Sequence, residues 1–331
     1  MKTKLLLIGT AVTLAIVPMA GVSALAKTRT LKAVCEIPAD NIAMSMAWKY
    51  ADAVKRYSNG QLVINILGNG EVIPTEEQIF AVGKGVIDLD FIMGDDISQA
   101  TGLGLGMSQT NMKPWEERKR GIWDFYRKVL AEETNTFWLG HYLSPQWWVI
   151  TANKPWKSPK EMKGAKIRCG STHFAAVKAI GAIPVSSPMS EIYSAMERGV
   201  VDGFVFPSGG WIEWGWQEVT KYLVGPRILT GQGSAPLLNL DVWKSLSEQE
   251  QKWLLQPMLD YEKDWFAFSY WIFAGDVYGE EAMVKAGLKR IKWSDEDNKS
   301  FDKIWRDASW KYATSEMKPD VAKRFSELIG R

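Results

Sequence analysis

The stretch of sequence most informative about the fold spans residues 158–204 and reads SPKEMKGAKIRCGSTHFAAVKAIGAIPVSSPMSEIYSAMERGVVDGF. A strand expected over 165–169 is followed by Ser171, which is placed to cap a helix that ends at Gly181. An extended run over 184–187, a helix from Met189 to Gly199 and a strand over 200–206 complete the pattern. Strands that alternate with helices form parallel sheets with crossover helices, so this stretch predicts an α/β unit.

The same alternation occurs nearer the amino terminus. Strands are expected over 30–34, 62–67 and 87–93, with a helix over 43–54 and another that begins at Thr75. A chain of 331 residues is longer than one typical domain. The two α/β units therefore predict two similar lobes: lobe I over 27–147 plus 236–274, and lobe II over 148–235 plus 275–331.

Two further segments carry predictions about the architecture. From Ser247 to about Gly287 the helical pattern hardly breaks. Forty helical residues would extend about 60 Å, so we expect one long helix across both lobes, kinked at Pro257 or Gly275. The run GLGLG over 102–106 lacks the G-x-G-x-x-G spacing of a dinucleotide site, and we interpret it as a flexible loop.

The amino terminus has the three-part layout of a secretory signal peptide. A basic head over 1–4 precedes an uncharged apolar stretch over 5–17, and Ala24-Leu25-Ala26 forms a small-x-small exit site. The apolar stretch has about thirteen residues, fewer than the roughly twenty that span a bilayer, although an uncleaved anchor is the alternative. We therefore expect residues 1–26 to be removed, with cleavage after Ala26, and the protein to be exported to a bacterial periplasm.

The composition is that of a globular chain with a real core, because 46% of residues are hydrophobic and 24% are charged. Without Lys2 and Lys4 of the signal segment, 38 basic residues balance 38 acidic ones, so no basic excess favours nucleic acid. The aromatic content is unusual, with 17 Trp, 10 Tyr and 12 Phe, none of them before residue 48.

Residue types that carry catalysis or bind metals are scarce. The two cysteines, Cys35 and Cys169, could pair in an oxidising compartment, but we interpret them as small buried hydrophobic residues. The two histidines, His141 and His173, are not spaced as metal ligands, and no G-x-S-x-G, phosphate-loop or H-E-x-x-H motif is present. We therefore expect neither a metal nor a cofactor, and no enzymatic activity.

One basic residue stands where a ligand would bind. Arg168 ends the strand 166–168, immediately before the turn Cys169-Gly170-Ser171 into a helix. Ligands of open α/β sheets bind beyond the carboxyl ends of the strands. A guanidinium beside a helix amino terminus suits a carboxylate. Position alone leaves open the alternative of a surface arginine at a strand end.

The stretch 158–204 resembles the substrate-binding proteins of tripartite ATP-independent periplasmic (TRAP) transporters. The segments AWKYADAVKRYSNGQLVINILGNGEVI, over 47–73, and AVGKGVIDLDF, over 81–91, resemble the first lobe of that family. The resemblance extends over nearly the whole mature chain. It implies two lobes around a cleft, bridged by a long helix, that close on an organic acid and deliver it to a membrane permease. Family members are usually monomers.

The resemblance also implies roles for single residues. The arginine of the family's G-x-K-x-R strand clamps the ligand carboxylate, and that position is Arg168. A second polar contact from the preceding strand would be Gln146. After the Asp202-Gly203 turn the family usually has an Asn, or an aromatic residue preceded by an acid, whereas Phe206 stands here without either. This departure argues against a polyhydroxylated sugar acid or a metal-bridged keto acid.

The remaining candidate contacts are aromatic or lie in a loop. Trp148 and Trp211 are candidates to line the cleft, which would favour a flat, apolar or aromatic monocarboxylate, although packing in the core or at the hinge is the alternative for each. Ring faces also suit cations, so a zwitterionic ligand stays open, as does a dicarboxylate. Glu36 and Asn41 follow the first strand and are further candidates, although a solvated loop explains them equally well.

Three other classes of protein remain as alternatives. An exported enzyme on this scaffold would need an acid–base pair, and the sequence offers no obvious one. A sensor ectodomain or scavenging module would lack a permease. A binding protein of an ATP-driven importer is a closer rival, but the G-x-K-x-R strand and the long helix favour the TRAP type.

Overall fold

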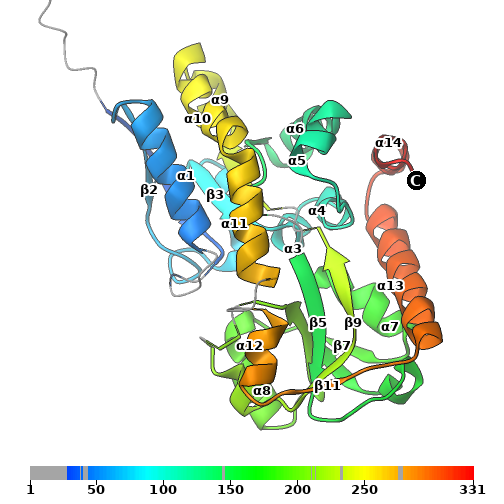
Figure 1. Cartoon of the computed structure of the whole chain (residues 1–331). Helices are drawn as coiled ribbons and strands as arrows, with labels where there is room; N and C mark the ends of the chain where they lie inside the picture. The colour runs from blue at the N-terminus through cyan, green and yellow to red at the C-terminus, as the bar shows by residue number, and fades with distance from the viewer. Residues whose placement is uncertain are drawn as a thin grey trace, which may run out of the picture.

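A computed structural model describes residues 28–37, 39, 44–143, 146–209, 211–212, 214–231, 234–274 and 279–331. Two β-sheets form two lobes, and Figure 1 shows them one above the other. The expected signal peptide and Asn41 lie outside the described residues. Within those ranges, none of the helices combines the length and the apolar character needed to cross a membrane.

The first sheet has the strand order β2-β1-β3-β10-β4. β1 pairs in parallel with β2 and β3, whereas β10 pairs antiparallel with β3 and β4. The helices α1 and α2 connect the parallel strands, which confirms the α/β pattern expected near the amino terminus. The bounds are β1 (Arg29–Cys35), α1 (Met44–Tyr57), β2 (Leu62–Ile66), α2 (Thr75–Gly83), β3 (Leu89–Ile92), β4 (Thr136–Trp138) and β10 (Ala235–Asn239).

The second sheet has the order β11-β9-β5-β8-β6-β7. β6 pairs in parallel with β7 and β8, and β5 pairs antiparallel with β8 and β9. The stretch 158–204 therefore forms the α/β unit predicted from its sequence. The bounds are β5 (Gln146–Ala152), β6 (Lys166–Arg168), α7 (Phe174–Ala179), β7 (Ile183–Val185), α8 (Ile192–Glu197), β8 (Gly203–Pro207), β9 (Tyr222–Thr230) and β11 (Lys289–Ile291).

The remaining helices cover the sheets and connect the lobes. They are α3 (Gly94–Ile97), α4 (Leu103–Met107), α5 (Pro114–Lys119), α6 (Ile122–Thr134), α9 (Leu240–Ser245), α10 (Glu248–Asp260), α11 (Glu262–Ala274), α12 (Glu280–Lys285), α13 (Asp295–Ser315) and α14 (Pro319–Ile329). Short 3₁₀ turns are η1 (Pro159–Met162), η2 (Ser171–His173), η3 (Met189–Glu191) and η4 (Trp216–Glu218). Apolar side chains fill both faces of each sheet.

The carboxyl-terminal helices pack on both lobes, whereas the expected boundaries assign them to one. The long helix α13 packs on α7 of the second lobe, along the right side of Figure 1. Val321 and Phe325 of α14, however, pack in the apolar cluster of the first sheet, against α6. The expected division places residues 275–331 in lobe II, and it remains a prediction.

The single long helix expected from Ser247 to Gly287 is wrong in its continuity. Helix α10 ends at Asp260, α11 begins at Glu262, and the two follow each other in Figure 1 toward α12 of the second lobe. Pro257 has no N–H for the carbonyl one turn earlier, and the Tyr261 N–H bonds to the Pro257 carbonyl as α10 ends. Helix α10 nevertheless continues past Pro257 to Asp260, so the division at Tyr261 does not coincide with the proline. Gly275 lies outside the described residues.

The run GLGLG over 102–106 is not a flexible loop. It forms α4, and its residues from Leu103 to Gly106 are buried. A Cβ atom at Gly102 would overlap the carbonyl of Glu316, and one at Gly104 would overlap the backbone of α3. The glycines therefore allow close contact between backbones. A run of small residues in the sequence is equally compatible with such a contact and with a loop.

The two cysteines are free thiols, and both are buried. Cys35 ends β1 of the first sheet, whereas Cys169 follows β6 of the second. Burial raises the pKa of Cys35 well above its ordinary value and raises that of Cys169 to about 12. The interpretation as small hydrophobic residues is confirmed.

We therefore expect neither thiol to react with Ellman's reagent in the native protein, because thiolate formation and access are both suppressed. Two thiols per chain should react after unfolding in guanidinium chloride. Fast reaction of a thiol in the folded protein would contradict the burial described for Cys35 and Cys169.

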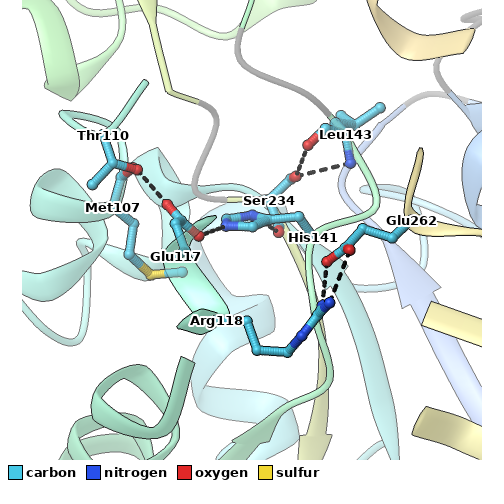
Figure 2. Close-up of polar contacts among 8 residues, drawn as sticks. All are labelled: Met107, Thr110, Glu117, Arg118, His141, Leu143, Ser234 and Glu262. Carbon is cyan, nitrogen blue, oxygen red and sulfur yellow. Dashed lines mark hydrogen bonds and ion pairs between the residues drawn. The ribbon is translucent and has the colours of Figure 1, made fainter. Parts of the chain in front are cut away.

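A cluster of buried polar groups joins two of the segments that cross between the lobes, the one before β5 and the one before β10 (Figure 2). His141 precedes β5, and its Nε2 lies 2.7 Å from Glu117 Oε2 while Nδ1 lies 3.1 Å from the Ser234 carbonyl. Ser234 precedes β10, and its hydroxyl accepts the Leu143 N–H at 3.1 Å. Thr110 donates its hydroxyl to the other oxygen of Glu117 at 2.6 Å. We call Glu117, His141 and Ser234 the hinge clasp.

A second link lies beside the hinge clasp. Arg118 donates both terminal nitrogens to the carboxylate of Glu262, at the start of α11. Figure 2 shows this pair next to His141, on the same side of the crossing segments. Helix α5 is thereby linked to the start of α11, the helix that leads toward α12 of the second lobe.

Replacing Glu117 by Ala should lower the free energy of unfolding by about 1–3 kcal/mol, because Thr110 and His141 lose a buried acceptor. The midpoint of urea unfolding measures this loss. Glu116→Ala is the control, since that side chain is exposed and should cost less than about 0.5 kcal/mol. Equal midpoints for the two variants would contradict a stabilising role for the hinge clasp.

Candidate functional site

Arg168 lies at the carboxyl end of β6, between two parallel neighbours. In the strand register it stands beside Val185 of β7 and Phe204 of β8. Because all three strands end at this edge, the loops that follow them converge there. The position matches the one expected for a ligand-binding arginine.

The guanidinium of Arg168 is held inside the protein and is not turned toward bulk solvent. The residue is 9% exposed, and its Nε and Nη2 both donate to the Ser187 carbonyl, at 3.1 and 2.7 Å. Burial lowers the pKa of Arg168, but arginine keeps its charge in proteins. A buried cation bonded to one neutral carbonyl is stabilised by an anion nearby.

The helix expected directly after Arg168 is shorter than predicted. A 3₁₀ turn, η2, comes first, and the six residues of α7 follow. Ser171 is the first residue of that turn, and its hydroxyl points across the lobe junction to Asp95 instead of capping a helix. The groups at this edge that can hold an anion are therefore the guanidinium, the Ser171 hydroxyl and the Thr172 N–H.

Asp95, on α3 of the first lobe, is the partner of these groups. Its Oδ1 accepts the Thr172 N–H at 3.0 Å and the Ser171 hydroxyl at 3.3 Å. Burial and the charge of Asp96 raise the pKa of Asp95 to about 6, although Thr172 and the nearby charge of Arg168 act in the opposite direction. The two lobes thus meet through a carboxylate beside the arginine.

More carboxyl groups lie on the same side of the junction. Glu36 follows β1, and its Oε2 accepts the Met93 N–H at 2.8 Å. Burial and the charge of Asp96 raise the pKa of Glu36 well above its ordinary value, and a hydrogen bond joins the two carboxyls. Burial also raises the pKa of Asp90 well above its ordinary value, and neither of its oxygens has a partner among the described residues. Burial favours the neutral form of both Glu36 and Asp90.

Two of the predicted aromatic contacts are close together. Trp148 of β5 and Phe206 of β8 are half-buried, with ring centroids 6.1 Å apart. Trp148 also packs on His173, at 4.5 Å between centroids. The indole N–H of Trp148 is buried and has no acceptor among the described residues. An unpaired donor and partly exposed rings suit a surface that another molecule completes.

The other predicted site residues have different surroundings. Gln146 begins β5 and is buried, and its Nε2 has no acceptor in the described part of the chain. Trp211 is 1% exposed, stacks on Phe204 at 4.6 Å and donates its Nε1–H to the Pro207 carbonyl at 2.7 Å. Trp211 is thus part of the core beneath β8 in this structure, and its role as a ligand contact remains a prediction.

Neither histidine is placed as a general base. Burial and the charge of Arg168 lower the pKa of His173 to about 3, so its ring is neutral at physiological pH. Both of its nitrogens lack partners among the described residues. His141 belongs to the hinge clasp. The described residues also contain no group of three or more His, Cys, Asp and Glu side chains arranged to hold a metal ion.

The sequence interpretation missed the acids opposite Arg168. Asp95 and Asp96 follow the parallel strand β3 directly, at its carboxyl end. The strand-end rule that selected Arg168 applies equally to them. Ser187 was not identifiable, because its contribution is a backbone carbonyl.

Two hollows in the described part of the chain are lined by residues other than Arg168. One, of about 330 Å³, lies on the second lobe between Arg227, Glu280 and Arg290. The other has about 30 Å³ and lies between Ser108 of the first lobe and His173 and Trp305 of the second. The second is the size of a water molecule and not of a solute.

Comparisons with known proteins agree with this architecture. The family model described as bacterial extracellular solute-binding protein, family 7, matches residues 35–307. A solute-binding protein of Albidiferax ferrireducens is 28% identical over 312 residues, which are 87% of this chain and 88% of that protein. The ectoine-binding periplasmic protein TeaA of Halomonas elongata is 29% identical over 193 residues, 55% of this chain and 50% of TeaA.

A solved structure has the same fold. The TRAP periplasmic solute-binding protein of Desulfovibrio salexigens, with bound orotic acid, superposes with a TM-score of 0.77 at 18% identity. The match covers 91% of this chain and 99% of that one. Since the family model spans most of the sequence and the two-lobed α/β fold agrees, the chain belongs to family 7 of the bacterial extracellular solute-binding proteins, the substrate-binding proteins of TRAP transporters.

Proposed function

We propose that this protein captures an organic acid through Arg168 and delivers it to a TRAP membrane permease. The observation that carries the proposal is the buried guanidinium at the end of β6, at the junction of the two lobes. Arginine binds a carboxylate through paired, charge-assisted hydrogen bonds. Exclusion of water when the lobes close strengthens this pairing, because the local dielectric constant falls.

The half-buried rings near this edge support an apolar or aromatic monocarboxylate. Trp148 and Phe206 offer ring surface, and the unpaired N–H groups of Trp148 and Gln146 offer donors for a ligand oxygen. Binding sites for small molecules combine apolar walls with a few placed polar groups in this way. The orotic acid bound by the Desulfovibrio salexigens protein is a ligand of this class.

A zwitterionic ligand is the second candidate, and one observation favours it. The hydrogen-bonded carboxyls of Glu36 and Asp96 lie in the lobe opposite Arg168. A ligand with a carboxylate at one end and a cation at the other would place the cation near these acids. TeaA, the relative that binds ectoine, makes a zwitterion a reasonable probe.

Binding and release would need no bond chemistry. A ligand favours the closed form only by its greater affinity for that form, and reopening at the permease releases it. We propose further that the mature chain begins after Ala26 in the periplasm and acts as a monomer without turnover of the ligand.

Replacing Arg168 by Ala should weaken binding of the native acid by about 10–150-fold, since charge-assisted hydrogen bonds contribute about 1.5–3 kcal/mol. A thermal-shift screen of purified protein against benzoate, orotate, succinate, taurine, ectoine and glycine betaine identifies a binder, because a ligand of the native state raises Tm. Isothermal titration calorimetry then compares the variants.

The matched control is Arg198→Ala, because Arg198 is exposed on the same lobe and bonds only within its own helix turn, to Ser194. This variant should bind as the wild type does. Unchanged affinity of Arg168→Ala for the acid would contradict the clamp, and consumption of the acid with release of product would indicate an enzyme.

The variant Asp96→Asn separates the two ligand classes. Loss of a carboxylate should weaken binding of ectoine or glycine betaine at least about 5-fold while leaving benzoate or orotate unaffected, because only the former carry a cation. The same calorimetric titration measures both. Asp52→Asn, an exposed acid on α1, is the control for net charge. Equal losses for the zwitterionic and the anionic probes would argue against a ligand cation near Glu36 and Asp96.

A further inference from the structure

Asp95 joins the two lobes through a carboxyl group, the same group by which the proposed ligand would bind. Its Oδ1 accepts hydrogen bonds from the Thr172 N–H and the Ser171 hydroxyl of the second lobe. Ser98, one turn after Asp95, adds a hydroxyl contact of 3.3 Å to Ser171. The carboxyl group of Asp95 thus takes two donors that a ligand carboxylate could use, close enough to Arg168 for the two charges to influence each other.

The second lobe is shaped to admit this side chain. Gly170 lies between Arg168 and the turn η2, and a Cβ atom built there would overlap Oδ2 of Asp95. The backbone of Gly170 has φ −73°, which any residue can adopt, so conformational freedom does not explain the glycine. The close approach of the carboxylate does.

These contacts lead to an inference that rests on the proposed function of Arg168. We propose that Asp95 is an internal acceptor that occupies the hydrogen-bond donors of η2 in the ligand-free protein and holds the lobes together until a ligand displaces it.

The contact made by Asp95 lowers the apparent affinity for a ligand. A ligand binds only the fraction of molecules in which the donors of η2 are free, so its apparent affinity falls by that fraction. Simple anions that offer no more than Asp95 itself are therefore rejected. An acid that also packs on the rings of Trp148 and Phe206 can displace Asp95.

Protonation should modulate the contact in a definite direction. The pKa of Asp95 is raised to about 6 in the closed arrangement by burial and Asp96, against an ordinary value of 3.8. Closure therefore takes up a proton: the closed form gains stability as the pH falls from about 6 to about 4, and the gain is lost above pH 6. The difference of about two pKa units corresponds to at most about a 100-fold change in the ratio of closed to open molecules.

Other titratable groups near Asp95 must be separated from it. Asp96 lies on the same helix, and Glu36 and Glu76 act on Asp96. Arg168 and the Cys169 thiol face Asp95 from the second lobe. A variant that removes only the titration of Asp95 distinguishes its contribution from those of these neighbours.

The experiment measures the distance between the lobes without any ligand. Nitroxide labels on Glu77→Cys of α2 and Lys178→Cys of α7, both exposed, report that distance by double electron–electron resonance. The native thiols are buried and do not take the label. The protein is unfolded and refolded during purification to remove any bound solute, and spectra are recorded at pH 5 and pH 8.

The wild type should show a short-distance population that grows from pH 8 to pH 5. Asp95→Ala and Gly170→Ala should shift most molecules to the longer distance, since one removes the acceptor and the other blocks its approach. Asp95→Asn keeps a neutral acceptor and should remain closed without the pH dependence. Asp52→Asn should match the wild type.

A wild-type distribution in both Asp95→Ala and Gly170→Ala would overturn the proposal, as would a ligand-free wild type that is wholly open at both pH values. A pH response retained in Asp95→Asn would assign the titration to a neighbouring carboxyl and overturn the role of protonation. Because no ligand is present, these outcomes do not depend on whether Arg168 binds the transported acid.

Discussion

The structure of the lobe junction depends on the burial of one guanidinium. A charge removed from water needs compensation, and Arg168 donates two hydrogen bonds to the Ser187 carbonyl within its own lobe, while Asp95 across the junction is close enough for its charge to act on Arg168. Asp95 in turn is buried at a cost, which appears as its raised pKa. A ligand carboxylate that replaces Asp95 would keep Arg168 compensated and return Asp95 to water.

The two lobes contribute unequally to this arrangement. The second supplies the cation, the donors of η2 and the rings of Trp148 and Phe206, whereas the first supplies Asp95 and the paired carboxyls of Glu36 and Asp96. Closure therefore brings the cation of the second lobe near carboxyl groups of the first lobe, whose pKa values are raised by burial. The hinge clasp and the Arg118–Glu262 pair lie where the chain crosses between the lobes, so they fix the segments about which such a movement would occur.

Much of the architecture could be predicted because it depends on local patterns of hydrophobic and turn residues. The alternation of strands and helices over 158–204 and near the amino terminus gave both parallel units, and the strand-end position of Arg168 followed from them. Predictions failed where the outcome depends on what packs against a segment. The glycines of α4 allow contact with α3 and the backbone near Glu316, and no local pattern distinguishes such a contact from a loop. The break between α10 and α11 at Tyr261 likewise has no local signal, because Pro257 lies inside α10 and the helix continues past it.

The sequence by itself determined the fold class and the strand-end position of Arg168, because hydrophobic periodicity and turn residues act over a few neighbouring positions, and its resemblance to TRAP substrate-binding proteins indicated the family. Only the tertiary structure decided what surrounds that arginine. Asp95 and Thr172 are separated by 77 positions and meet because two lobes close on each other, and Trp211 is buried because it stacks on Phe204. Contacts between distant segments depend on the packing of whole lobes, which no short stretch of sequence encodes.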